Sequence, residues 1–206
     1  MQLGGNVSLN SYLQLTDSKK SISDMANELA IALELLQKTR TGTLIAIEQT
    51  YVDRYYINPG YTINANFSKE LLLTILNPKS PLHDGAVIMR GFTIVAAAVI
   101  LPMTENPKLD WQYGTRHRAA IGFSEISDSL CIVVSEETGN ISIAHHGRIT
   151  RCPNTAFVKE QIEKYYNSIV KTHKRKNSLR RFISGLFSAK TKAELEESDL
   201  EPVQES

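Results

Sequence analysis

Apolar residues spaced three and four positions apart predict an amphipathic helix near the start of the chain. Ser21 and Asp24 stand in capping-box spacing at its expected beginning, and we expect the helix to end between Thr39 and Gly42. The apolar positions of its buried face are Ile22, Met25, Ala26, Leu29, Leu33 and Leu36. This helix should therefore lie with one side against a core.

Three further segments favour helices. Ser68 is a suitable cap for a helix that runs to about Leu76, because the following Asn77-Pro78 cannot continue it. Residues 155–170 predict a last helix. Residues 116–127 predict another, whose inward-facing positions are Ala119, Ala120, Phe123 and Ile126.

Short apolar runs rich in β-branched residues predict buried strands between these helices. The runs comprise residues 43–48, 86–89, 93–100, 130–135 and 141–144. Turns at Arg90-Gly91 and Gly139-Asn140 join two pairs of them into hairpins. Because strands alternate with helices while hairpins intrude, the sequence predicts an α/β fold with a twisted central mixed β-sheet flanked by helices.

Length and charge narrow the functional classes. The 206 residues fit one domain of ordinary size, and the net charge of +1 argues against a protein that wraps nucleic acid. Residues 1–20 are interpreted as an N-terminal arm, 21–171 as the folded domain, and 172–206 as a charged tail, basic and then acidic.

No apolar run approaches the roughly 20 residues of a membrane-spanning helix. Two cysteines without a CxxC pair favour a reducing, intracellular compartment.

Polar residues concentrate in three loops, at residues 81–86, 114–118 and 135–139, and such loops commonly carry function. In the second loop, Arg116 and Arg118 flank a histidine directly before a predicted helix. Their guanidinium groups suit phosphate oxygens, and a helix amino terminus adds backbone donors. The loop is therefore a candidate polyphosphate clamp. The alternative is a solvated basic turn whose arginines pair with Glu125 or Asp128.

In the first loop, the adjacent His83 and Asp84 could hold a divalent metal or accept a proton from a hydroxyl group. Gly85 would let a ligand approach the backbone closely. Asp-Gly is also an ordinary turn sequence, so the loop taken alone favours a simple turn over a functional site.

In the third loop, Glu136 or Glu137 could complete a metal site while the Ser135 hydroxyl contacts a phosphate; the alternative is a charged turn. His145-His146 is another candidate ligand pair. Adjacent residues on a strand point to opposite faces, so we expect these two to mark a hairpin end rather than to share one metal.

Taken together, the three loops resemble the diadenylate cyclase domain, the bacterial family that makes cyclic di-AMP. The segments that carry the resemblance are His-Asp-Gly-Ala at 83–86, Gly-Thr-Arg-His-Arg at 114–118 and Val-Val-Ser-Glu-Glu-Thr-Gly at 133–139. The match extends over about residues 39–151 and is most like the membrane-linked type of the family. The resemblance implies that two ATP molecules are condensed, with release of two pyrophosphates, at the interface of two facing subunits. It also implies a homodimer or higher homo-oligomer and a divalent metal (Mn²⁺, Mg²⁺ or Co²⁺).

The resemblance also assigns roles to individual residues. Asp84 would contact the ribose 3′-hydroxyl and assist its deprotonation, with Gly85 and Ala86 against the nucleotide. His83 and Glu137 would contact the metal. The residues that would hold the triphosphate or otherwise bind ATP are Thr115, Arg116, His117, Arg118, Ser135 and Glu136.

Ile100 and Leu101 would lie at the adenine. Related proteins often place a tyrosine before that leucine, so Ile100 would keep an apolar contact but lose aromatic stacking. The commonest relatives carry membrane helices upstream of the cyclase domain, and this sequence has none. We therefore expect a shortened form of an enzyme from the cytoplasmic side of the bacterial membrane, which has a regulatory protein partner in such relatives; a naturally soluble cyclase is the alternative.

Two other functional classes remain open at this stage. A catalytically weak module that binds ATP or a cyclic dinucleotide would fit the departure at Ile100. A nucleic-acid or membrane adaptor would act through the basic residues between Lys171 and Lys192, but nothing in the core favours it.

Overall fold

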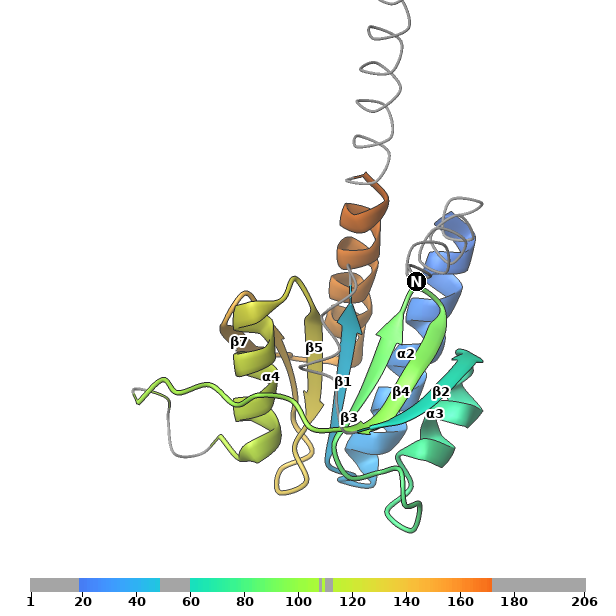
Figure 1. The fold of residues 1–206 in the computed structure, drawn as a ribbon. Coiled ribbons are helices and arrows are strands. Elements are labelled where there is room, and N and C mark those ends of the chain that lie inside the picture. Colours follow the sequence, from blue (N-terminus) through green and yellow to red (C-terminus); the bar gives the residue numbers. More distant parts are fainter. Residues whose placement is uncertain (1–18, 49–59, 108, 110–112, 172–206) are drawn as a thin grey trace, which may run out of the picture. The chain divides into compact units, whose positions relative to one another are not determined.

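The computed structural model describes residues 19–48, 60–107, 109 and 113–171 (Figure 1). Residues 1–18 of the expected arm and the whole expected tail, 172–206, lie outside the described residues. The chain divides into two compact units, 1–166 and 167–206, and the fold presented below is that of the first.

A seven-stranded sheet in the order β2-β4-β3-β1-β5-β6-β7 forms the centre of this unit. β1 pairs with β3 in parallel and every other pairing is antiparallel, which confirms the mixed α/β fold. The strands are β1 (Thr43–Glu48), β2 (Tyr61–Asn66), β3 (Ala86–Arg90), β4 (Thr93–Val99), β5 (Leu130–Val134), β6 (Ile141–His145) and β7 (Arg148–Arg151).

The two edge strands, β2 and β7, were not predicted. Both are largely exposed along their length, whereas every residue of β1 and β5 is buried. An edge strand has neither a long apolar run nor a fully covered face, so its hydrophobic signal is weak. The central strands, by contrast, are apolar throughout because both faces of the sheet are covered.

The helices are α2 (Lys19–Lys38), α3 (Lys69–Ile75) and α4 (Thr115–Ile126), and residues 155–171 are also helical. Ser68 caps α3 as predicted, because its Oγ accepts a hydrogen bond of 3.2 Å from the Leu71 amide. The predicted capping box at Ser21 is wrong, since Ser21 lies inside α2. Ile126 was also misplaced: it is 50% exposed because it is the last residue of α4, beyond the part that packs on the sheet.

The core occupies both sides of the sheet. Ala120 and Phe123 of α4 pack with Leu44 and Ala46 of β1 in one buried cluster. The alternating residues of β1 are fully buried as well, so the opposite face is also covered. In Figure 1, α4 lies over the β5–β7 side of the sheet and α2 passes behind β3 and β4.

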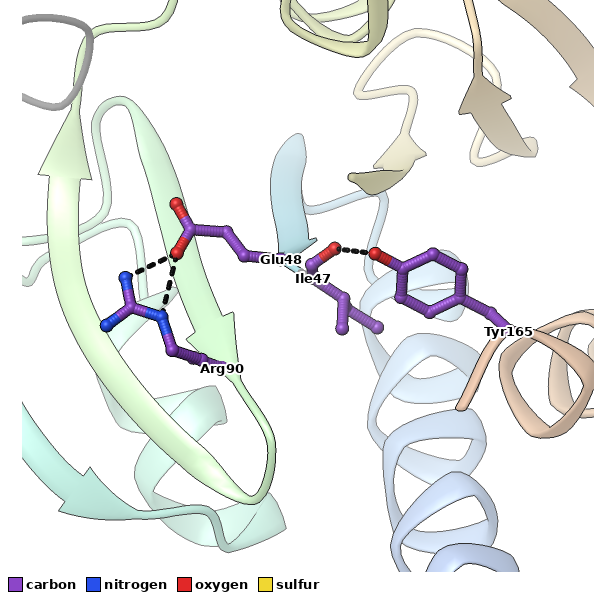
Figure 2. A network of polar contacts seen from close by, with 4 residues as sticks. All are labelled: Ile47, Glu48, Arg90 and Tyr165. Atoms are coloured by element: carbon purple, nitrogen blue, oxygen red, sulfur yellow. Dashed lines mark hydrogen bonds and ion pairs between the residues drawn. The ribbon is translucent and has the colours of Figure 1, made fainter. Parts of the chain in front are cut away.

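Polar contacts fix the carboxyl end of β1 (Figure 2). Glu48 is fully buried, and its Oε2 accepts hydrogen bonds from Arg90 Nη2 at 2.6 Å and Nε at 3.1 Å. Among the described residues, its Oε1 has no hydrogen-bond partner. The Tyr165 hydroxyl lies 2.9 Å from the Ile47 carbonyl and 2.8 Å from that of Asp128, so one side chain links the last helix to β1 and to the α4–β5 connection. This end of the sheet is therefore tied by buried groups.

Loss of Arg90 should destabilise the fold in a pH-dependent way. Burial raises the pKa of Glu48 above 4.5 and Arg90 opposes the rise, so Arg90→Met raises it further. Near pH 8 the variant would bury an unpaired carboxylate, and we expect the free energy of unfolding to fall by about 3 kcal/mol. Near pH 5, Glu48 takes up a proton more readily in the folded state than in the unfolded state, because its pKa is raised in the folded state. The loss of stability caused by Arg90→Met should therefore be smaller at this pH. Urea denaturation at both pH values measures this.

The double variant Glu48→Gln/Arg90→Met is the control, because it has no carboxylate to titrate. Its stability relative to the wild type should vary much less between the two pH values. Equal destabilisation of Arg90→Met near pH 5 and pH 8 would contradict the role given to the pair.

Candidate functional site

The pairing register aligns the ends of four strands along one edge of the sheet. This is the edge at which strands begin and end, not the edge formed by an outermost strand. Val99 of β4 pairs with Ala86 of β3, Ala86 with Leu44 of β1, and Leu44 with Val133 of β5. β1 and β3 begin at this row, whereas β4 and β5 end there. Neighbouring strands lie about 4.8 Å apart, so the row spans roughly 14 Å. The first loop, the segment after β4 and the third loop therefore all leave the sheet at one edge.

The second and third loops form one open pocket on the surface. Its lining residues are Gly114, Thr115, Arg116, His117, Val134, Ser135, Glu136 and Glu137. The first four come from the amino-terminal end of α4 and the last four from the end of β5 and the loop after it. Residues from two of the three predicted loops thus share one pocket, while Arg118 and the first loop are not among its lining residues.

Arg116 makes an ion pair across this pocket. Its Nη1 lies 2.7 Å from Glu136 Oε2. The sequence offered Glu125 and Asp128 as partners for the arginines, but Arg116 pairs with neither of them. Glu125 accepts a hydrogen bond from Thr104 instead. Strand β5 carries Glu136 to the amino end of α4, a proximity that spacing along the chain does not reveal. The positive charge of Arg116 is therefore partly neutralised by a carboxylate of the same chain.

Arg118, two residues further along α4 than Arg116, is half-buried, and its Nε donates a 3.3 Å hydrogen bond to the Tyr113 carbonyl. His117, between the two arginines, is also half-buried, and its ring centroid lies 5.4 Å from that of Tyr113. Burial lowers the pKa of His117 below 6.5, and the charge of Glu137 opposes the shift. His117 is therefore mostly neutral at pH 7 and available as a hydrogen-bond donor or acceptor.

Gly42 lies directly beside the Arg116–Glu136 pair, and the sequence did not single it out. A Cβ atom at this position would lie 2.6 Å from Arg116 Nη1 and 2.7 Å from Glu136 Oε2. Real Cβ atoms do not approach so closely, so the ion pair rests directly on the glycine backbone. The sequence signal was a glycine immediately before a buried strand, which we interpreted only as the end of a helix.

The first loop presents its side chains differently. His83 Nδ1 lies 2.6 Å from the Ser80 carbonyl. A carbonyl only accepts, so Nδ1 donates this hydrogen bond, and in the neutral ring the lone pair then lies on Nε2. Asp84 is exposed, whereas Ala86 is fully buried in the core cluster. Gly85 has φ 106°, and a Cβ there would lie 2.8 Å from the Val99 carbonyl oxygen, so the loop packs tightly on the end of β4.

The segment after β4 turns across α4. Leu101 is buried, while Ile100 is 67% exposed and offers an apolar surface beside the same edge. The Thr104 amide donates a 3.0 Å hydrogen bond to the Arg118 carbonyl. Gly122 makes this crossing possible, since a Cβ there would clash with the Thr104 backbone nitrogen. The segment is thus fixed to the helix that carries the arginines.

His145 and His146 do not point to opposite faces. His145 ends β6, but His146 lies in the turn with φ 49°, where strand alternation no longer applies. Their ring centroids are 3.9 Å apart at the β6–β7 hairpin. The hairpin-end position is confirmed, and the argument that separated the two rings is wrong.

Within the residues that the structure describes, no group of three or more His, Cys, Asp or Glu side chains is arranged to hold a metal ion. None of the helices described there combines the length and the hydropathy of a membrane-spanning segment.

Known proteins resemble this chain over the same region. Residues 30–149 match the DAC family model, described as the DisA bacterial checkpoint controller nucleotide-binding domain. The cyclic di-AMP synthase CdaA of Bacillus subtilis is 47% identical over 132 residues, which are 64% of this chain and 48% of that protein. The chain thus spans about half the length of that relative.

Two further proteins show the same likeness. A diadenylate cyclase of Mycoplasma genitalium is 43% identical over 152 residues, 73% of this chain and 74% of that protein. The crystal structure of a double mutant of DacA from Staphylococcus aureus superposes with a TM-score of 0.68 at 38% identity. It covers 71% of this chain and 98% of that one, so the likeness extends to the fold.

His117 provides a test of the pocket's electrostatics. We expect its NMR titration midpoint to lie below 6.5, because burial disfavours the imidazolium ion. Glu137→Gln should lower the midpoint further, since it removes the charge that favours protonation. Glu136→Gln is the matched control and should move the midpoint much less. A rise in the midpoint with Glu137→Gln would contradict this picture.

Proposed function

The chain belongs to the DAC family of nucleotide-binding domains, and on that premise we propose that it is a diadenylate cyclase, which condenses two ATP molecules into cyclic di-AMP and releases two pyrophosphates. The observation that carries the proposal is the convergence of an arginine-bearing helix terminus and an Asp-Gly loop at one edge of the sheet. These parts lie within the residues that match the family.

The pocket suits a triphosphate. Arg116 supplies a guanidinium group within it and Ser135 a hydroxyl. Arg118, from the same helix but outside the pocket lining, would supply a second guanidinium group. The amino end of α4 adds backbone N–H groups, since its N-cap residue Gly114 makes no side-chain cap hydrogen bond. Nucleotidyl transfer depends mainly on holding the reacting groups in line and neutralising the charge that develops on the phosphate. These residues would perform that task without a glycine-rich phosphate loop.

Asp84 is the proposed general base. Its carboxylate is exposed and stands before a glycine that lets the loop pack closely on β4. It would accept the proton of a ribose 3′-hydroxyl, which then attacks the α-phosphate of a second ATP. One chain carries a single set of these groups, so two copies would have to face each other, each contributing one nucleotide. The adenine would lie against Ile100 and Leu101, with an apolar contact rather than a stacked ring.

His83 and Glu137 fit a divalent metal as partial ligands. The free Nε2 of His83 and the exposed carboxylate of Glu137 are both suitable donors, and phosphate oxygens would complete the coordination. Bound Mn²⁺, Mg²⁺ or Co²⁺ would supply positive charge next to the triphosphate. In the cell, the resemblance to membrane-linked cyclases implies a place on the cytoplasmic side of the bacterial membrane, with a regulatory protein partner.

Incubation with ATP and Mn²⁺, followed by chromatography, should yield cyclic di-AMP and pyrophosphate. Asp84→Asn and Arg118→Ala should each reduce the rate by about a hundredfold or more, the usual effect of losing a general base or a charge-stabilising donor. Arg148→Ala, an exposed arginine on the edge strand β7, is the matched control and should retain activity. Thermal unfolding shows whether each variant keeps its fold.

Tight ATP binding without pyrophosphate release would instead favour a module that binds ATP without turnover. The reason to consider such a module is Ile100, which stands where related proteins often have a stacking tyrosine. Activity that persists unchanged in Asp84→Asn would overturn the assignment of the base.

A further inference from the structure

We infer that Glu136 is an internal competitor for the phosphate-binding arginine: it holds Arg116 in the pocket over Gly42 and must be displaced when the triphosphate binds. This inference rests on the proposed function, since it concerns the same pocket. It changes the role of Glu136 from a nucleotide ligand to a positioning residue that acts through Arg116, and it adds Gly42 to the site.

The first support is the geometry of the ion pair. Arg116 Nη1 and Glu136 Oε2 lie 2.7 Å apart, within the pocket lined by the first turn of α4 and the loop after β5. A carboxylate there occupies the same donors that a phosphate oxygen would use. The pocket's arginine is thus already engaged by an anion from its own chain.

The second support is the unequal exposure of the two side chains. Glu136 is 63% exposed and Arg116 24% exposed. When the pair opens, Glu136 can move into water, whereas the more buried Arg116 has less room to move. An exposed ion pair contributes little free energy, so a polyanionic triphosphate can replace the single carboxylate. The arrangement orders the arginine before binding and keeps its charge compensated.

The third support is Gly42. A Cβ at this position would lie 2.6 Å from the guanidinium, 2.7 Å from the Glu136 carboxylate and 3.0 Å from Glu136 Cβ. Gly42 is not among the glycines with positive φ in the described chain, so the requirement is for space rather than for an unusual backbone. Alanine at position 42 would therefore push the arginine outward without straining the local backbone.

Two substitutions in the full chain test the inference. Glu136→Gln should lower KM for ATP by about two- to fivefold, the range expected for a surface ion pair, with kcat changed little. Gly42→Ala should raise KM for ATP, because its Cβ displaces the Arg116 guanidinium, while the melting temperature stays near that of the wild type, because the displaced atoms are the ends of flexible side chains. Glu160→Gln, which removes another exposed, ion-paired carboxylate, is the matched control and should change neither constant.

A double-mutant cycle separates competition from a general charge effect. In an Arg116→Ala background, Glu136→Gln should no longer increase affinity, measured by calorimetry with α,β-methylene ATP so that turnover is not needed. Weaker or unchanged ATP binding in Glu136→Gln would overturn the inference, and so would an equal gain in affinity in the Arg116→Ala background.

The outcomes for the two proposals can be told apart. If the wild type makes no cyclic dinucleotide but Glu136→Gln binds the analogue more tightly in an Arg116-dependent way, the competition stands and the cyclase assignment fails. If product forms normally and Glu136→Gln binds ATP more weakly, the cyclase assignment stands and Glu136 is a direct nucleotide ligand.

Discussion

The register of the central strands is the constraint on which the candidate site depends. One row of paired residues crosses four strands and consists of Val99, Ala86, Leu44 and Val133. The first loop, the segment after β4 and the third loop all leave the sheet next to this row. A shift of one residue in any of these pairings would turn that strand's buried side chains toward the opposite face. Because both faces of β1 and β5 are packed, such a shift is strongly disfavoured. The core thereby fixes where polar loops outside it meet.

The two ends of β1 use charge in opposite ways. At its carboxyl end, Glu48 and Arg90 form a pair in which the carboxylate is fully buried. Removing one partner of such a pair leaves a charge without water or a counter-ion, so this pair cannot open in the folded state without a large loss of stability. At the amino end, Arg116 and Glu136 form a pair of which one member is mostly exposed. Water can solvate the released carboxylate, so this pair can exchange partners.

Glycines contribute to the site by leaving space at contacts between distant segments. Gly42 lies under the Arg116–Glu136 pair, Gly85 packs on the end of β4, and Gly122 lets the segment after β4 cross α4. Each contact brings together parts of the chain that are separate in sequence. A larger side chain at any of these positions would move a neighbouring loop rather than simply fill a gap.

Local sequence determined much of the architecture. Continuous apolar runs identified the central strands, and Ser68 with Asn77-Pro78 bounded α3, because burial on two faces and capping are properties of neighbouring residues. The order and spacing of the His-Asp-Gly-Ala, Gly-Thr-Arg-His-Arg and Ser-Glu-Glu-Thr-Gly segments also indicated the family. Tertiary structure alone decided the edge strands β2 and β7, the contact of the two histidine rings at the β6–β7 hairpin, and the choice of Glu136 as the partner of Arg116. Those features depend on which strands lie side by side. Only the folded sheet brings such residues together, and the periodicity of the sequence contains no information about the distance between them.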